Sequence, residues 1–202
     1  NDIRGVSAMT IDINKLTDKY ADYVIPVKIA SVSDYQISPN YGTALYHLSL
    51  KNDFSGDYMG EIRVYQAKSN GEPNKGTDSA PIEPLSKINT KSFYAISDSV
   101  CYFYAGKFDR NSYDRKKFLV ELTIKDDQIT MEGVNPDLQL TPKGAVVNRI
   151  VTDSPTDQRY ELVTVELDLS YTYVDLTSLA TVRPTLWAGG KVNLREQRLK
   201  QN

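Results

Sequence analysis

Few residues in this sequence have side chains suited to catalysis. Among its 202 residues are one cysteine, Cys101, and one histidine, His47. A Ser-His-Asp triad needs a histidine, and common zinc sites use several histidine or cysteine ligands. Only a triad centred on His47 is available, and the apolar sequence around Cys101 favours a buried, inert thiol. We therefore expect no catalytic residues, no metal site and no cofactor.

Two short acidic patterns are the remaining candidates for chemistry. Glu166 and Asp168 lie two residues apart on one face of a predicted strand, near the carboxylate separation of a retaining glycosidase. Residues 109–114 supply oxygen ligands at short spacing, but they lack the central glycine and distal glutamate of an EF-hand loop. Solvent-facing charge is the simpler expectation for both patterns, and we predict that the protein is not an enzyme.

Aromatic side chains are better candidates for ligand binding, because the chain has 14 tyrosines and one tryptophan. Trp187 lies near Gly189 and Gly190, where a backbone can bend or approach a ligand. The simpler expectation is that its ring plugs one end of the β-barrel predicted below. Loops carry function on a rigid scaffold. The candidates in predicted loops are Tyr35, Tyr41 and Tyr113.

The charge and the distribution of apolar residues exclude several classes of protein. The chain has 24 basic and 26 acidic residues, and this near-balance argues against a nucleic-acid-binding protein. No apolar segment approaches the roughly 18 residues of a membrane span. One cysteine cannot form an intramolecular disulfide. No signal peptide is recognisable at Asn1, and we expect a mature chain from which an export signal has been removed.

Alternation of apolar and polar residues predicts a protein made almost entirely of β-strands. The clearest strand covers residues 160–174, in which every second residue from Val163 to Tyr173 is apolar and lies on one face. Such a pattern is typical of a strand with one face in the core and one in water. The expected core residues are Val165, Leu167 and Leu169. The residues expected in water are Thr164, Glu166 and Asp168.

The order of the predicted strands favours an all-β, up-and-down antiparallel barrel. About eight strands follow residue 58 mostly in sequence order, and a sandwich of the same strands is the alternative. The polar segment 52–57 resembles a domain junction, so we predict a first domain at 1–52 and the barrel at 53–202. The first domain has three predicted strands, at 6–13, 23–30 and 43–50. The charged tail 195–202 is expected to fray.

Four short motifs resemble a known family. They are Tyr23–Ile29, Asp53–Tyr58, Tyr171–Asp175 and Ala188–Val192. Their sequences resemble surface lipoproteins of Bacteroidetes polysaccharide-utilisation systems, which have an immunoglobulin-like N-terminal domain and a lipocalin-like C-terminal barrel, both of unknown function. An immunoglobulin-like domain needs about seven strands, and three are predicted here. Either that domain is truncated, or its strands complete the packing of the barrel.

The resemblance implies a non-catalytic glycan-binding or adhesion module, exported to the periplasm or the outer-membrane cell surface. It implies glycans or outer-membrane proteins as partners, and it allows a lipid anchor on the unprocessed protein. Two alternatives stay open: a lipocalin-like carrier of a small apolar ligand, and a structural partner of outer-membrane proteins. The carrier needs free space inside the barrel. The residues that would have to leave that space are Phe118, Val120, Leu122, Val165 and Leu167.

Overall fold

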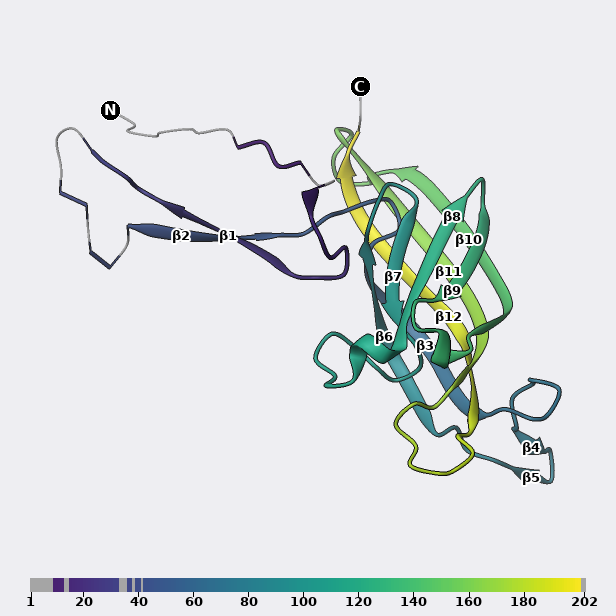
Figure 1. Cartoon of the computed structure of the whole chain (residues 1–202). Helices are drawn as coiled ribbons and strands as arrows, with labels where there is room; N and C mark the ends of the chain where they lie inside the picture. Colours follow the sequence, from purple (N-terminus) through teal and green to yellow (C-terminus); the bar gives the residue numbers. More distant parts are fainter. Residues whose placement is uncertain (1–8, 13–14, 33–35, 38, 41, 201–202) are drawn as a thin grey trace. The chain divides into compact units, whose positions relative to one another are not determined.

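The computed structural model describes residues 9–12, 15–32, 36–37, 39–40 and 42–200. The chain divides into two compact units, Asn1–Ser49 and Leu50–Asn202 (Figure 1). Half of the strand predicted at 6–13 lies outside the described residues, and the part that is described, 9–12, is not in a strand.

The described part of the first unit contains a two-stranded antiparallel ribbon. Strand β1 (Tyr23–Lys28) pairs with strand β2 (Thr43–Leu48), and Pro26 lies opposite Leu45. Proline cannot donate a ladder hydrogen bond, and it is tolerated here because each strand of a two-stranded sheet has a free edge. Two strands do not make the seven of an immunoglobulin-like domain, so that assignment stays a prediction.

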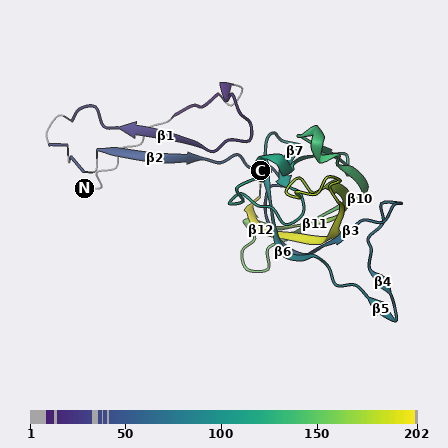
Figure 2. The same ribbon diagram turned by 60° about the horizontal axis from the view of Figure 1, so that its bottom comes forward.

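The second unit is an eight-stranded antiparallel sheet that curves into a nearly closed barrel, as predicted (Figures 1 and 2). Its strands are β3 (Gly56–Gln66), β6 (Ser86–Ala95), β7 (Val100–Tyr104), β8 (Leu119–Lys125), β9 (Gln128–Gly133), β10 (Thr141–Asp153), β11 (Tyr160–Val174) and β12 (Thr185–Leu199). The order in the sheet is β10-β11-β12-β3-β6-β7-β8-β9. The first strand of the barrel, β3, therefore pairs with the last, β12, and β9 and β10 are the two edges.

Short elements lie in the connections of the barrel. Strands β4 (Gly76–Thr77) and β5 (Ala80–Pro81) form a small hairpin between β3 and β6. The 3-10 helix η2 (Arg115–Phe118) precedes β8, and η3 (Pro136–Leu138) joins β9 to β10. Among the described residues there is no α-helix.

The segment between β9 and β10 forms the 3-10 helix η3. The Asn135 side chain accepts a hydrogen bond from the Asp137 backbone N–H at 3.1 Å and caps the turn. The tail 195–202 was expected to fray, but β12 continues to Leu199 because it pairs with β11 as far as Tyr160.

The interior of the barrel follows the predicted alternation along β11. Val165, Leu167 and Leu169 are at most 1% exposed, whereas Asp168 is exposed. Thr164 and Glu166 are half-buried rather than exposed. The five side chains that a ligand carrier would have to keep apart are all completely buried in one core cluster: Phe118, Val120, Leu122, Val165 and Leu167. This packing argues against a carrier with its ligand at that level of the barrel.

Two glycines allow the first and last strands of the barrel to pair closely. Gly60 of β3 and Gly190 of β12 both have φ of 155°. A Cβ on Gly60 would collide with the backbone oxygen of Lys191, and a Cβ on Gly190 would collide with that of Glu61. Strands β3 and β12 approach each other more closely here than any side chain would permit.

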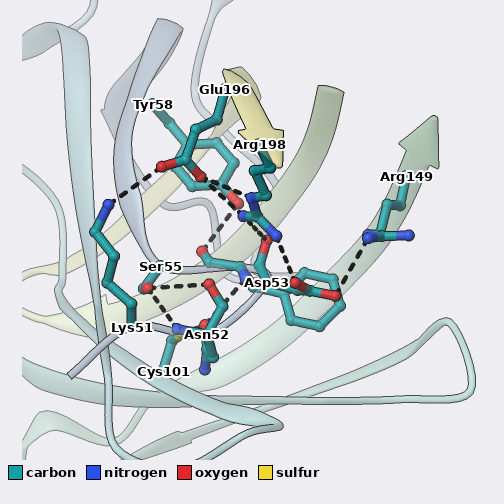
Figure 3. Close-up of polar contacts among 10 residues, drawn as sticks. Lys51, Asn52, Asp53, Ser55, Tyr58, Cys101, Arg149, Glu196 and Arg198 are labelled. Carbon is teal, nitrogen blue, oxygen red and sulfur yellow. Dashed lines mark hydrogen bonds and ion pairs between the residues drawn. The ribbon is translucent and has the colours of Figure 1, made fainter. Parts of the chain in front are cut away.

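The predicted junction segment attaches the start of the barrel to its neighbouring strands (Figure 3). The Asn52 amide nitrogen donates to the backbone oxygen of Ser97 at 2.6 Å. Its amide oxygen accepts from the Phe54 backbone N–H at 3.0 Å and from the Cys101 thiol at 3.3 Å. Burial raises the pKa of Cys101 to about 11, so the thiol stays protonated at neutral pH. Cys101 is the buried, inert thiol that the sequence predicts.

Charged residues extend this attachment to β10 and β12. Asp53 forms ion pairs with Arg198 and, at 3.3 Å, with Arg149. Glu196 pairs with Arg198 at 2.9 Å and with Lys51 at 3.1 Å (Figure 3). Single surface ion pairs contribute little, but a connected network of several holds its members in one arrangement. This network of ion pairs explains why the charged end of β12 remains part of the strand.

A buried lysine holds the loop after β7 against β6. Strands β6 and β7 pair at only two positions, at the end of β6, so the earlier part of β6 is not paired with β7. Lys91 of β6 is 4% exposed and donates to the backbone oxygens of Gly106 at 2.7 Å and Phe108 at 3.0 Å. Burial lowers the pKa of Lys91 to about 7, and the charge of Asp109 opposes part of that shift.

We predict that the free energy of unfolding increases between pH 7 and pH 9 because of Lys91. The pKa of this amine is about 7 when folded, below its value in the unfolded chain. The unfolded state therefore binds more protons in this window, and stability rises with pH by an amount on the order of 2 kcal/mol. Denaturant melts at both pH values measure the change.

In a Lys91→Met variant this increase should disappear, whereas Lys107→Met, at an exposed lysine of the same loop, should retain it. Equal increases in the wild type and in Lys91→Met would contradict the assignment.

Candidate functional site

The structure places one predicted ligand-binding residue in a hollow on the protein surface. Trp187 lies on β12 between Leu186 and Ala188, and both neighbours belong to the buried core cluster. Because side chains alternate along a strand, Trp187 faces outward. The expectation that its ring plugs the barrel is therefore wrong. Tyr113 is 98% exposed in a loop, and Tyr35 and Tyr41 lie outside the described residues.

The hollow has a volume of about 380 Å³ on the outer face of β3, β12 and β11. Strand pairing assembles it, because Trp187 lies opposite Tyr65 of β3 on one side and opposite Thr172 of β11 on the other. On the same face, Gly189 lies opposite Arg63 and Ser170. The residues of β3 lie more than 100 positions before those of β11 and β12 in the sequence.

The tryptophan ring forms the floor of the hollow. A Cβ added to Gly189 would lie 2.6 Å from two carbons of the Trp187 ring, so the ring extends along β12 over this glycine. Tyr65 supports it from β3, with ring centroids 6.1 Å apart and ring planes inclined at 48°. The Lys75 ammonium lies over both rings, 5.7 Å from the centroid of Trp187 and 6.0 Å from that of Tyr65.

Charged and hydroxyl groups line the rest of the hollow. Glu61 and Arg63 form an ion pair on β3, and both are about half exposed. Asp168 and Ser170 contribute from β11. An aromatic surface surrounded by a few hydrogen-bonding groups is the general composition of a small-molecule or sugar site. Its donors and acceptors can bind hydroxyl groups.

The two carboxylates considered for hydrolysis, Glu166 and Asp168, have different contacts. Glu166 forms an ion pair with Lys191 at 2.9 Å, and Asp168 lines the hollow. In the loop at 109–114, the Asp109 carboxylate accepts from the Asn111 backbone N–H at 2.9 Å and from the Ser112 hydroxyl at 3.0 Å. This carboxylate therefore stabilises its own turn.

No group of three or more histidine, cysteine, aspartate or glutamate side chains in the part of the chain that the structure describes is arranged to hold a metal ion. Nor does the same part of the chain contain a helix long and apolar enough to cross a membrane.

Sequence reasoning found Trp187 but missed Tyr65 and Lys75. Alternation along β3 places Ile62 and Val64 in the core and hence Tyr65 outside, so that orientation could have been predicted. The pairing of β3 with β12 could not be read from local patterns. Lys75 lies in the long connection between β3 and β6, where no periodicity indicates direction.

Comparison with known proteins assigns the chain to a family. A family model described as "-like, C-terminal" matches residues 42–187, which is more than half of the chain. The chain belongs to this family of C-terminal domains. No curated protein matches it.

Solved structures share the fold. The chain is similar to two proteins of unknown function from Bacteroides ovatus, with TM-scores of 0.73 and 0.70 and identities of 18% and 20%. It covers 60% of each of them, and each match covers 90% of this chain. An auxiliary nutrient binding protein from Bacteroides thetaiotaomicron has a TM-score of 0.67 at 18% identity, over 86% of this chain and 57% of that protein. The chain thus spans about 60% of the length of these structures.

We predict that Gly189→Ala displaces the Trp187 ring. The added methyl group would occupy the space of two ring carbons, so the ring must move toward solvent. Trp187 is the single tryptophan of the chain, so tryptophan fluorescence reports on it alone. We expect emission at longer wavelength and stronger quenching by acrylamide. Gly144→Ala is the matched control, because its Cβ would meet only the Ser170 hydroxyl, at 3.2 Å. Unchanged emission in Gly189→Ala would refute the proposed position of the ring.

Proposed function

We propose that this protein is a non-catalytic module that binds a glycan in the outer hollow of its barrel. The observation that supports the proposal is the aromatic floor, in which the Trp187 ring lies over Gly189 beside Tyr65. A sugar ring has an apolar face of C–H groups that packs on an aromatic ring, and its hydroxyl groups point outward from the edge of the ring. The groups around the floor are placed to receive those hydroxyls.

Each polar group of the hollow has a role in this arrangement. The carboxylates of Glu61 and Asp168 accept hydrogen bonds from sugar hydroxyls, and the guanidinium of Arg63 donates to them. Lys75, which lies over the aromatic rings, moves aside or donates to a ring substituent. Hydrogen bonds to charged groups are stronger than hydrogen bonds between neutral groups. These residues can therefore orient a ligand that has little apolar surface.

Two comparisons agree with a role in nutrient capture. One structural relative is named an auxiliary nutrient binding protein, and the sequence motifs resemble surface lipoproteins of polysaccharide-utilisation systems. We propose that the whole protein is exported and acts at the cell surface, with an immunoglobulin-like N-terminal domain and a lipocalin-like barrel. The alternative is a structural partner of outer-membrane proteins, which would bind no glycan.

The proposal includes the absence of hydrolysis. Glycoside hydrolysis uses two opposed carboxylates in different environments. Glu166 is held by Lys191, and Asp168 lies beside it on the same strand rather than across a cleft. These positions suit binding and orientation rather than acid-base catalysis.

We expect Trp187→Ala to weaken glycan binding at least tenfold, because a central tryptophan commonly contributes more than about 1.4 kcal/mol to binding. A glycan array identifies the ligand, and titration of the soluble glycan measures the affinity. Tyr113→Ala is the matched control: it also removes one aromatic ring, from a loop position that is 98% exposed, and should leave affinity unchanged. Absence of binding across the array, or equal affinity in Trp187→Ala, would favour the structural partner.

We also expect no release of reducing sugar from a panel of polysaccharides. A reducing-sugar assay with the purified protein tests this directly. Activity that is present in the wild type and lost in Glu166→Gln would show that the acidic pair is catalytic and that the non-catalytic proposal is wrong.

A further inference from the structure

A second cavity lies on the opposite face of the same strands. It has a volume of about 300 Å³, and its apolar lining includes Val64, Phe108 and Leu186. Val64 and Leu186 belong to the core cluster of the barrel, whereas Trp187 and Tyr65 face the outer hollow. The two cavities are therefore separated by the sheet itself. None of the residues that could hold a glycan in the outer hollow lines this inner cavity.

Among the residues that the structure describes, one hydroxyl group lining the inner cavity has no hydrogen-bond partner. Tyr173 is 1% exposed and lines the cavity. Among the described residues, every fully covered side-chain nitrogen or oxygen has a hydrogen-bond partner. The Tyr173 hydroxyl forms no hydrogen bond within that part of the chain, so it is not fully covered, and Tyr173 lines the cavity. Burial raises the pKa of Tyr173, and the hydroxyl is therefore a permanent donor.

The neighbouring tyrosine on the same face of β11 is different. Tyr171 is also 1% exposed, but its hydroxyl accepts a hydrogen bond from the Gly106 backbone N–H at 3.0 Å. It thus attaches the loop after β7 to the barrel. These two tyrosines both point inward and lie two residues apart, but only the Tyr171 hydroxyl takes part in a hydrogen bond within the fold. A hydroxyl that the fold leaves unpaired and not fully covered is available to a ligand.

We propose that the inner cavity binds a small uncharged molecule, in which an apolar ring carries one oxygen that accepts a hydrogen bond from the Tyr173 hydroxyl. The ring would pack against Phe108 and Leu186. Lys107 and Asp175 also line the cavity, and their opposite charges do not favour a charged ligand of either sign. Phenols and cyclic alcohols have the required composition. This site is independent of the glycan site.

The probe is p-cresol, and toluene is its counterpart without the oxygen. Titrations followed by NMR of the whole chain give both affinities. We expect Tyr173→Phe to bind p-cresol roughly 3- to 10-fold more weakly, the range for loss of one hydrogen bond, and to bind toluene as the wild type does. The variant removes one oxygen and keeps the ring, so the cavity remains.

Two control variants locate the site. Trp187→Ala removes the floor of the outer hollow and should bind p-cresol normally. Tyr171→Phe should lose stability, because the loop loses a hydrogen bond, and its affinity for p-cresol should change less than that of Tyr173→Phe. The proposal is overturned if the wild type does not bind p-cresol at millimolar concentration, if Tyr173→Phe binds it unchanged, or if Trp187→Ala abolishes binding. These three outcomes can be interpreted whether or not the protein binds glycans.

Discussion

The pairing of β3 with β12 is the interaction on which the rest of the structure depends. It joins the first and last strands of the barrel, from Met59 opposite Asn193 to Gln66 opposite Leu186. One side of the paired strands closes the core, and the other side brings Tyr65 beside Trp187. The close approach at Gly60 and Gly190 makes this pairing possible. Both candidate sites would be lost together without it, since each takes residues from both strands.

Alternation on β12 separates the two sites chemically. Leu186 faces a cavity lined by apolar side chains together with Lys107 and Asp175, and Trp187 faces a hollow surrounded by charges. A single residue of register difference would exchange these two environments. The sheet is one layer thick, so a ligand on one side and a ligand on the other would be held by adjacent residues without touching each other.

The sequence predicts the fold well where the two faces of a strand differ in polarity. Every second residue from Val163 to Tyr173 is apolar, and β11 has the predicted bounds, 160–174. The direction of Trp187 was predicted wrongly because Trp187, Ala188, Gly189 and Gly190 include no polar residue that marks the outer face. The end of β12 was missed for the opposite reason. Its charged residues look solvated, and their partners, Asp53 and Lys51, lie about 145 positions away.

The order of the strands also has a consequence for how the barrel forms during synthesis. β3 is the first strand of the barrel to be made, and β12, which covers one of its edges, is the last. Loop closure over such a distance is slow, and an uncovered strand edge invites pairing with other chains. The ladder between β3 and β12 therefore forms only after all the other strands of the barrel have been made, and until then β3 has one edge unpaired.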